Sequence, residues 1–154
     1  MKSTTAESLV NSIDSAILQI NNFSHANDRE KSFLALYLVV YVSGIYEEAI
    51  ETIINDKVAK LGENYLSNYM QNNLAERFRN PDIANILRLL GAFDKGWKDA
   101  VKSLPDKNKK ALDNIVLYKN SLAHGTAINL TLGDAIQYYK DSRIIIETID
   151  ATIL

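Results

Sequence analysis

The chain carries FLALYLVVYVSGIYEEAIETII at residues 33–54, the most apolar stretch of its sequence. Three carboxylates, Glu47, Glu48 and Glu51, interrupt this stretch, and charges of this kind are expensive in the centre of a bilayer. We therefore interpret residues 33–54 as a buried helix of a soluble protein, and we expect no contact with a membrane.

Size and composition predict one domain. The 154 residues are 47% hydrophobic and 23% charged, and a chain of this length buries about two thirds of its surface in a single core. The sequence has no cysteine, which excludes disulfides, thiolate nucleophiles and zinc sites that need sulfur. We expect one domain over residues 1–154, with its first few residues disordered. Its start, MKSTTAESLVNSIDSA, lacks the apolar block of a secretory signal, which favours a cytoplasmic protein.

Helical periodicity extends along nearly the whole chain, and no segment shows the alternation that is typical of a strand. Two prolines and six glycines leave few positions at which a helix would be broken. The patterning predicts an all-α bundle of about five or six helices. The first three should span residues 5–23, 28–60 and 62–78.

The second half of the chain contains clear start and stop signals. Residues 80–82, Asn-Pro-Asp, supply a capping side chain, a proline for the first turn and a carboxylate, so a short helix should begin there and end before Gly91. After an amphipathic segment, a further helix should span residues 106–124 and end before Gly125. The last helix should begin at Thr131.

Charge is distributed unevenly along the sequence. The formal net charge is −2, so the whole molecule does not attract nucleic acid and any contact with RNA must be local. Residues 95–119 contain seven lysines and three aspartates, an excess of four positive charges. Such an excess is common on a solvated helix face and also suits a phosphate-binding surface, and both interpretations stay open.

Lys119 breaks the pattern of the helix predicted over residues 106–124. It lies within an apolar stripe, where a lysine is costly unless its ammonium reaches water or finds a carboxylate. Either the stem packs while the charge reaches solvent, or the charge has a partner. Glu47 is the candidate partner and supporting residue, because it lies on the inward stripe of the long apolar helix. We expect Lys119 and Glu47 to approach within salt-bridge or water-bridged distance. The stripe around Lys119 comprises Leu112, Ile115, Val116, Leu122 and Ala123.

Asn120 and His124 are four residues apart and therefore share a face of the same helix. Histidine is the side chain that ordinarily exchanges protons near neutral pH, so His124 is a candidate general acid or base. The alternatives are that His124 only caps the helix and that Asn120 only bonds to a neighbouring helix. His25, the other histidine, falls in a polar turn and is expected at the surface. Because no histidines have metal-ligand spacing, we expect no metal and no cofactor.

The segment around these residues resembles a known signature. Residues 117–125 read LYKNSLAHG, which is similar to the signature of HEPN domains, an arginine and a polar residue followed shortly by a histidine. The closer resemblance is to the RiboL-PSP-HEPN branch, whose members commonly read RNxxAHG. Lys119 stands in place of the arginine, while the other four positions match: Asn120, Ala123, His124 and Gly125. Residues 41–53, 79–97 and those from Thr131 are also similar to the family.

The resemblance implies a helical bundle that pairs with a second copy about a two-fold axis. In active relatives the ribose 2′-hydroxyl attacks the adjacent phosphorus without a metal, which cleaves RNA and leaves a 2′,3′-cyclic phosphate. Such domains occur as toxins with antitoxin partners and in phage defence. By the same resemblance His124 would move the proton or hold the phosphate, Asn120 would orient the histidine or the ribose, and Lys119 would stabilise negative charge.

Lysine keeps the charge of the family's arginine but not its geometry. An arginine holds two phosphate oxygens with a planar fork, whereas the ammonium of a lysine is a compact point charge. Two functions therefore stay open. One is a homodimeric endoribonuclease with an adapted or weak site, and the other is a catalytically inactive dimeric module that binds RNA or nucleotides or assembles proteins.

Overall fold

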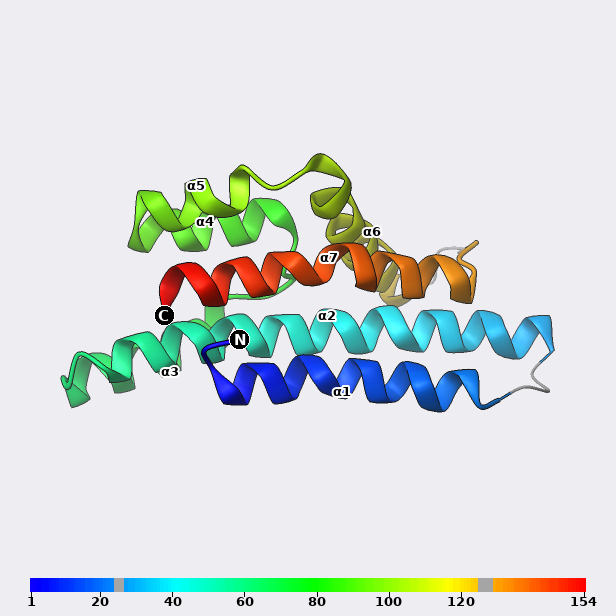
Figure 1. Cartoon of the computed structure of the whole chain (residues 1–154), viewed down its shortest axis with the longest axis horizontal. Coiled ribbons are helices and arrows are strands. Elements are labelled where there is room, and N and C mark those ends of the chain that lie inside the picture. The colour runs from blue at the N-terminus through cyan, green and yellow to red at the C-terminus, as the bar shows by residue number, and fades with distance from the viewer. Residues whose placement is uncertain (24–26, 125–128) are drawn as a thin grey trace.

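The computed structural model describes residues 1–23, 27–124 and 129–154. In these ranges the chain forms seven α-helices and no strand (Figure 1), which confirms the predicted all-α class. Seven exceeds the predicted five or six, because the short segment before Pro105 is a helix of its own. The helices are α1 (Thr4–Asn21), α2 (Asp28–Ala59), α3 (Asn64–Arg77), α4 (Ile83–Phe93), α5 (Lys95–Lys102), α6 (Asp106–Ala123) and α7 (Leu132–Ile153).

Polar side chains set the starts of five helices. At each of these starts the side-chain oxygen of the N-cap residue accepts a hydrogen bond from the backbone amide three residues later. At α2 the carboxylate of Glu30 also accepts from the backbone of the cap, which completes a capping box. The five N-cap residues are Ser3, Asn27, Asp82, Asp94 and Thr131.

The start of α4 differs from the prediction in one respect. Asp82, rather than Asn80, caps the helix, and α4 therefore begins at Ile83. Asn80 has a φ of 55°, in the left-handed region that asparagine enters more readily than most residues. Its side chain is thus available for a contact outside α4.

Gly91 does not end α4, which continues to Phe93. A Cβ atom at Gly91 would lie 2.9 Å from Cδ of Lys98 in α5, well inside the usual separation of two carbon atoms. The glycine therefore has a packing role, because it lets the stem of Lys98 lie against α4.

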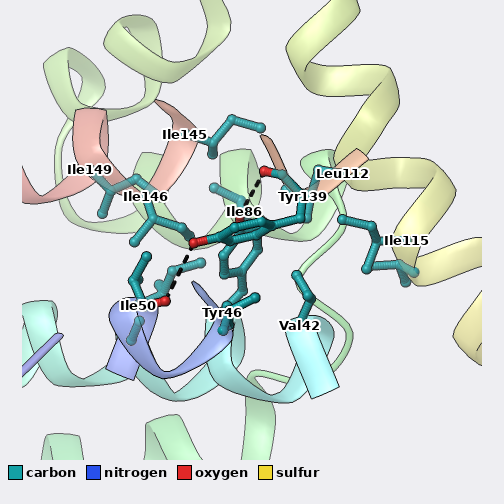
Figure 2. Packing of buried hydrophobic residues seen from close by; sticks show 14 of the residues in the cluster. Val42, Tyr46, Ile50, Ile86, Leu112, Ile115, Tyr139, Ile145, Ile146 and Ile149 are labelled. Carbon is teal, nitrogen blue, oxygen red and sulfur yellow. Dashed lines mark hydrogen bonds between the residues drawn. The ribbon is translucent and has the colours of Figure 1, made fainter. Parts of the chain in front are cut away.

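α2 is the centre of the fold. It packs against α1, α3, α6 and α7, while α4 and α5 pack on each other and α5 packs on α7. Figure 1 shows α1, α2 and α7 lying side by side along the long axis of the molecule. Side chains from α2, α6 and α7 meet in one core (Figure 2), whose fully buried members include Tyr46, Ile50, Leu112, Ile115, Tyr139 and Ile145.

Within the described ranges, α2 alone has the length and apolar composition needed to cross a membrane. In the fold, four other helices pack against it, and 44% of its most apolar window is buried. This is the arrangement of a core helix, and it is consistent with a soluble protein.

The first residues of the chain are bound to the last helix. The backbone amides of Lys2 and Ser3 both donate to the carboxylate of Asp150, at 2.8 Å for Ser3. The Ser3 hydroxyl also donates to Asp56 at 2.6 Å, and both Ser3 and Asp150 are buried. The expectation that the first few residues are disordered is therefore wrong.

Two tyrosines form a polar centre inside the core. The ring centroids of Tyr46 and Tyr139 lie 6.4 Å apart with an interplanar angle of 40° (Figure 2). The Tyr46 hydroxyl is 3.1 Å from that of Ser142, and the Tyr139 hydroxyl donates to Asp14 at 2.8 Å. Burial raises the pKa of both phenols, and the bond to the Asp14 carboxylate raises that of Tyr139 further. Both phenols therefore keep their protons to a higher pH in the folded protein than in the unfolded chain.

Candidate active site at the end of α6

The three candidate catalytic residues lie on the last turns of α6. The helix ends at Ala123, and His124 is its C-cap, with a backbone amide that donates to the carbonyl oxygens of Asn120 and Leu122. Lys119 and Asn120 are half-buried, whereas His124 is exposed. The sequence-predicted residues thus share one end of one helix, and the imidazole is open to solvent.

The ammonium of Lys119 is bonded to the turn between α3 and α4. Its Nζ donates to the side-chain oxygen of Asn80 at 2.9 Å. The backbone amide of Asn80 donates to Glu47 Oε2 on α2 at 3.1 Å, and its carbonyl oxygen accepts from the side chain of Asn85 on α4 at 2.9 Å. Asn80 therefore joins three helices and sets the position of the Lys119 charge.

The salt bridge predicted between Lys119 and Glu47 is not found in the described ranges. In the part of the chain that the structure describes, no direct ion pair joins the two side chains, and Asn80 bonds to both of them instead. The ion-pair partner of Glu47 is Arg79, at 3.7 Å. Glu47 thus supports Lys119 indirectly, by binding the backbone of Asn80. The side-chain oxygen of Asn80, rather than a carboxylate, accepts the bond from the ammonium.

Asn120 lines an open groove of about 680 Å³ between α6 and the start of α4. Asp113 on α6 accepts from the backbone amide of Ile83 at 2.9 Å, and Asp82 accepts from that of Asn85 at 2.8 Å. Two carboxylates therefore bind the positive end of α4 at the edge of the groove. No cation is among the residues that line it, so the groove is poorly suited to phosphate.

The apolar stripe of α6 is buried only in its first half. Leu112, Ile115 and Val116 lie in the core, whereas Leu122 is 42% exposed and Leu117, which lines the groove beside Asn120, is 58% exposed. Two large aliphatic side chains are thus accessible at the end of the helix that carries the candidate residues.

Comparison with known proteins assigns the chain to a family. The family model described as RiboL-PSP-HEPN matches residues 4–154, almost the whole chain. The chain belongs to the RiboL-PSP-HEPN family, within the HEPN superfamily. At the level of the superfamily, this membership supports an RNA-related role. Neither the curated proteins nor the solved structures that were compared gave a match.

Carboxylates crowd on α2 of this HEPN domain beside the turn that holds Lys119. Burial raises the pKa of Glu51, and the charge of Glu47 raises it further, while the Arg79 guanidinium acts in the opposite direction. The Glu51 carboxylate therefore retains a proton to a higher pH in the folded domain than in the unfolded chain.

The lysine-rich segment of the HEPN domain is partly paired with carboxylates. Three of the seven lysines in residues 95–119 form ion pairs with aspartates, within α5, within α6 or with α7, and a fourth bonds to Asn80. Two of these aspartates belong to the segment itself and only Asp141 comes from outside it, so an excess of positive charge persists and both interpretations stay open. The ion pairs are Lys95 with Asp99, Lys107 with Asp141 and Lys109 with Asp106.

Two residues named in the sequence analysis, His25 and Gly125, lie outside the described residues. Among the residues that are described, no three side chains of His, Asp or Glu gather closely enough to hold a metal ion. The absence of a cofactor stays a prediction.

The sequence does not predict the roles that Asn80 and Asp113 have in the site. Asn80 was expected to cap α4, and Asp113 contributes through a contact with the start of that helix. The bonds that give them their roles join residues 39 and 30 positions apart, so no local pattern predicts them. The nearest signal was the Asn-Pro pair itself, which marks a turn with an available amide side chain.

Proposed function

We propose that this HEPN domain is a cytoplasmic, metal-independent endoribonuclease that acts as a homodimer. The observation that carries the proposal is the exposed imidazole of His124 at the end of α6, close along the helix to the amide of Asn120 and the ammonium of Lys119. A proton-exchanging group, a polar orienting group and a cation are what cleavage at an RNA phosphate requires. By family resemblance its setting would be a toxin–antitoxin pair or phage defence, with an antitoxin protein as a partner.

In the proposed reaction a bond forms between the ribose O2′ and the adjacent phosphorus, and the bond from that phosphorus to O5′ breaks. A base takes the proton of the 2′-hydroxyl, and an acid gives a proton to the departing O5′. The products are a 2′,3′-cyclic phosphate and a 5′-hydroxyl. One imidazole cannot be base and acid in the same step, so a second His124 from the partner protomer would supply the other role.

Lys119 is held in a way that suits the stabilisation of negative charge. An ammonium has three donors, and the bond to Asn80 uses one of them, which leaves two for phosphate oxygens. The turn also fixes the charge in place, because Asn80 is itself bonded to Glu47. Fixed placement would offset part of what is lost without the arginine fork.

Leu117 marks the surface proposed for the homodimer. Its exposed fraction is 58%, and it lies on the face of α6 that carries Asn120 and His124, three and seven residues later. Large accessible aliphatic side chains next to a polar site are common at protein interfaces. Burying Leu117 against a second copy would bring the two His124 side chains into one cleft.

A second function is favoured by the same bond that positions Lys119. Because its ammonium joins α6 to the α3–α4 turn, Lys119 also serves as a structural tie. The domain would then be a non-catalytic dimeric module that binds RNA or nucleotides or assembles proteins. In that case the replacement of Lys119 would lower stability, and no variant of His124 would alter any RNA.

The two functions are separated by RNA cleavage in EDTA. Wild type, His124→Ala and Lys119→Arg are compared on total and transfer RNA, with Lys110→Ala, an exposed change on the same helix, as the matched control. The nuclease proposal predicts cleavage by wild type and the control, and at least a roughly 100-fold loss in His124→Ala. Cleavage by Lys119→Arg alone, or by no variant, would favour the non-catalytic module.

A further inference from the structure

A second pocket of about 450 Å³ lies between the C-terminal half of α3 and α4. Its floor is apolar and includes the buried side chains of Leu74 and Phe78. Its rim carries Tyr69, Arg77 and Arg88, and no carboxylate lines it. The remaining lining residues are Met70, Asn73, Asn85, Leu89 and Ala92.

The two arginines of this pocket are free to bind an anion. In the ranges that the structure describes, neither Arg77 nor Arg88 takes part in an ion pair, and Arg88 donates only to the side chain of Asn85, at 2.8 Å. Both side chains belong to exposed residues. Two guanidinium groups without carboxylate partners at the rim of one pocket produce a positive potential there, and their planar forks fit phosphate oxygens.

Aromatic side chains accompany these charges along α3. Tyr65 is 90% exposed and Tyr69 is 60% exposed. Tyr65, Tyr69, Asn73 and Arg77 follow one another at intervals of four residues, so each lies next to the following one on the helix surface, and the last three line the pocket. Exposed aromatic rings in line with an arginine are suited to stacking the bases of a single strand while the cation binds its backbone.

The pocket is connected to the proposed active site through one turn. Asn85 lines the pocket, and its side chain donates to the carbonyl oxygen of Asn80, whose own side chain binds Lys119. The groove beside Asn120 instead carries Asp82 and Asp113. A polyanion would therefore approach Lys119 from the arginine-lined pocket rather than along that groove.

We infer that the α3–α4 pocket binds a nucleotide of single-stranded RNA next to the site on α6, with a base stacked on Tyr69 and phosphates bound by Arg77 and Arg88. The choice of RNA as the ligand rests on the proposed function. The pocket itself rests on its own charge, aromatic rim and apolar floor.

The test measures binding separately from cleavage. The affinity of a short, unstructured, fluorescently labelled RNA is measured by anisotropy in a His124→Ala background, so that the strand stays intact. A double variant, Arg77→Gln with Arg88→Gln, is compared with Lys31→Gln with Lys140→Gln, which removes the same charge from two exposed lysines elsewhere. Tyr69→Ala is compared with Tyr69→Phe, which keeps the ring.

We expect the arginine variant to raise the Kd at least about tenfold and to lower the salt dependence of log Kd by about 0.7 for each phosphate that the variant no longer binds. Tyr69→Ala should raise the Kd about fivefold or more, whereas Tyr69→Phe should bind nearly as well as the parent protein. The lysine control should stay within about twofold of the parent, apart from a small effect of net charge.

Equal binding by the arginine variant and the lysine control would overturn the inference, as would the absence of RNA binding by the parent protein. Direct binding of labelled poly-glutamate that depends on the two arginines, in the absence of RNA binding, would identify a protein-docking site and would also overturn the inference. If wild type cleaves RNA but the pocket variants bind and cleave normally, the nuclease proposal stands and this inference fails. If binding depends on the pocket while nothing cleaves, the inference stands and the nuclease proposal fails.

Discussion

Lys119 donates a 2.9 Å hydrogen bond to the side chain of Asn80, and the backbone of Asn80 donates to Glu47. A lysine side chain ordinarily samples many rotamers, and ordering it costs conformational entropy. In this HEPN domain the fold itself orders the Lys119 side chain. Glu47 on α2 binds the α3–α4 turn, and Asn80 in that turn binds the ammonium. A lysine at the family's arginine position is thus fixed by its surroundings rather than by the shape of its own head group.

Asn80 contributes a side-chain bond to Lys119 and a left-handed backbone conformation, and two substitutions should separate these contributions. Asn80→Gly removes the amide that binds Lys119 but accepts the left-handed backbone, and we expect it to cost about 1 kcal/mol of unfolding free energy. Asn80→Ala loses the same bond and also has an unfavourable φ, which should add about 1 kcal/mol. Urea unfolding of both variants measures the difference. Wild-type stability in Asn80→Ala would contradict the role given to this turn.

The proposed dimer surface predicts a change of oligomeric state. Leu117→Asp places a charge on the exposed aliphatic surface of α6, and it should convert a dimer into a monomer and reduce RNA cleavage at least about tenfold. Leu18→Asp is the matched control, because Leu18 is 66% exposed on α1. Light scattering coupled to gel filtration gives the masses. A dimer that survives Leu117→Asp would place the interface elsewhere.

The buried phenols predict a loss of stability at high pH. Burial raises the pKa of Tyr46 in the folded state, so above about pH 10 the unfolded chain loses this proton while the native protein retains it. The native state then binds more protons, and stability falls as pH rises through this window. Tyr46→Phe should make the decline between about pH 9 and 11 less steep, as measured by urea unfolding. An unchanged slope would show that Tyr46 does not contribute to it.

Glu51 predicts a stabilising substitution. Because its pKa is raised in the folded state, first by burial and then by Glu47, the ionised carboxylate lowers stability at neutral pH. Glu51→Gln should therefore raise the unfolding free energy at pH 7, by less than about 1 kcal/mol since the side chain is partly solvated. The gain should disappear below about pH 4, where the carboxyl is protonated in both states. A loss of stability at pH 7 would show that Glu51 makes a favourable contact instead.

Much of the fold can be predicted from local sequence. The shape of the site cannot, because it depends on contacts between residues far apart in the chain. The cap at Thr131 could be predicted because it bonds to its own first turn. The prediction that α4 ends before Gly91 is wrong, since this glycine instead accommodates the Lys98 stem of the next helix. Lys119 interrupts an apolar stripe in the sequence, but its partner is an amide set by a turn 39 residues away. Spacing along one helix could not reveal that turn, nor the arginine pocket formed between α3 and α4.

The most direct test of the central claim is the chemistry of the RNA ends that the protein leaves in EDTA. Mass spectrometry of the cleaved fragments should find 2′,3′-cyclic phosphates and 5′-hydroxyls with wild type, and no such ends with His124→Ala. Uncut RNA under all conditions, 5′-phosphate ends, or the same products from His124→Ala would contradict the assignment of this domain as a metal-independent endoribonuclease that uses His124.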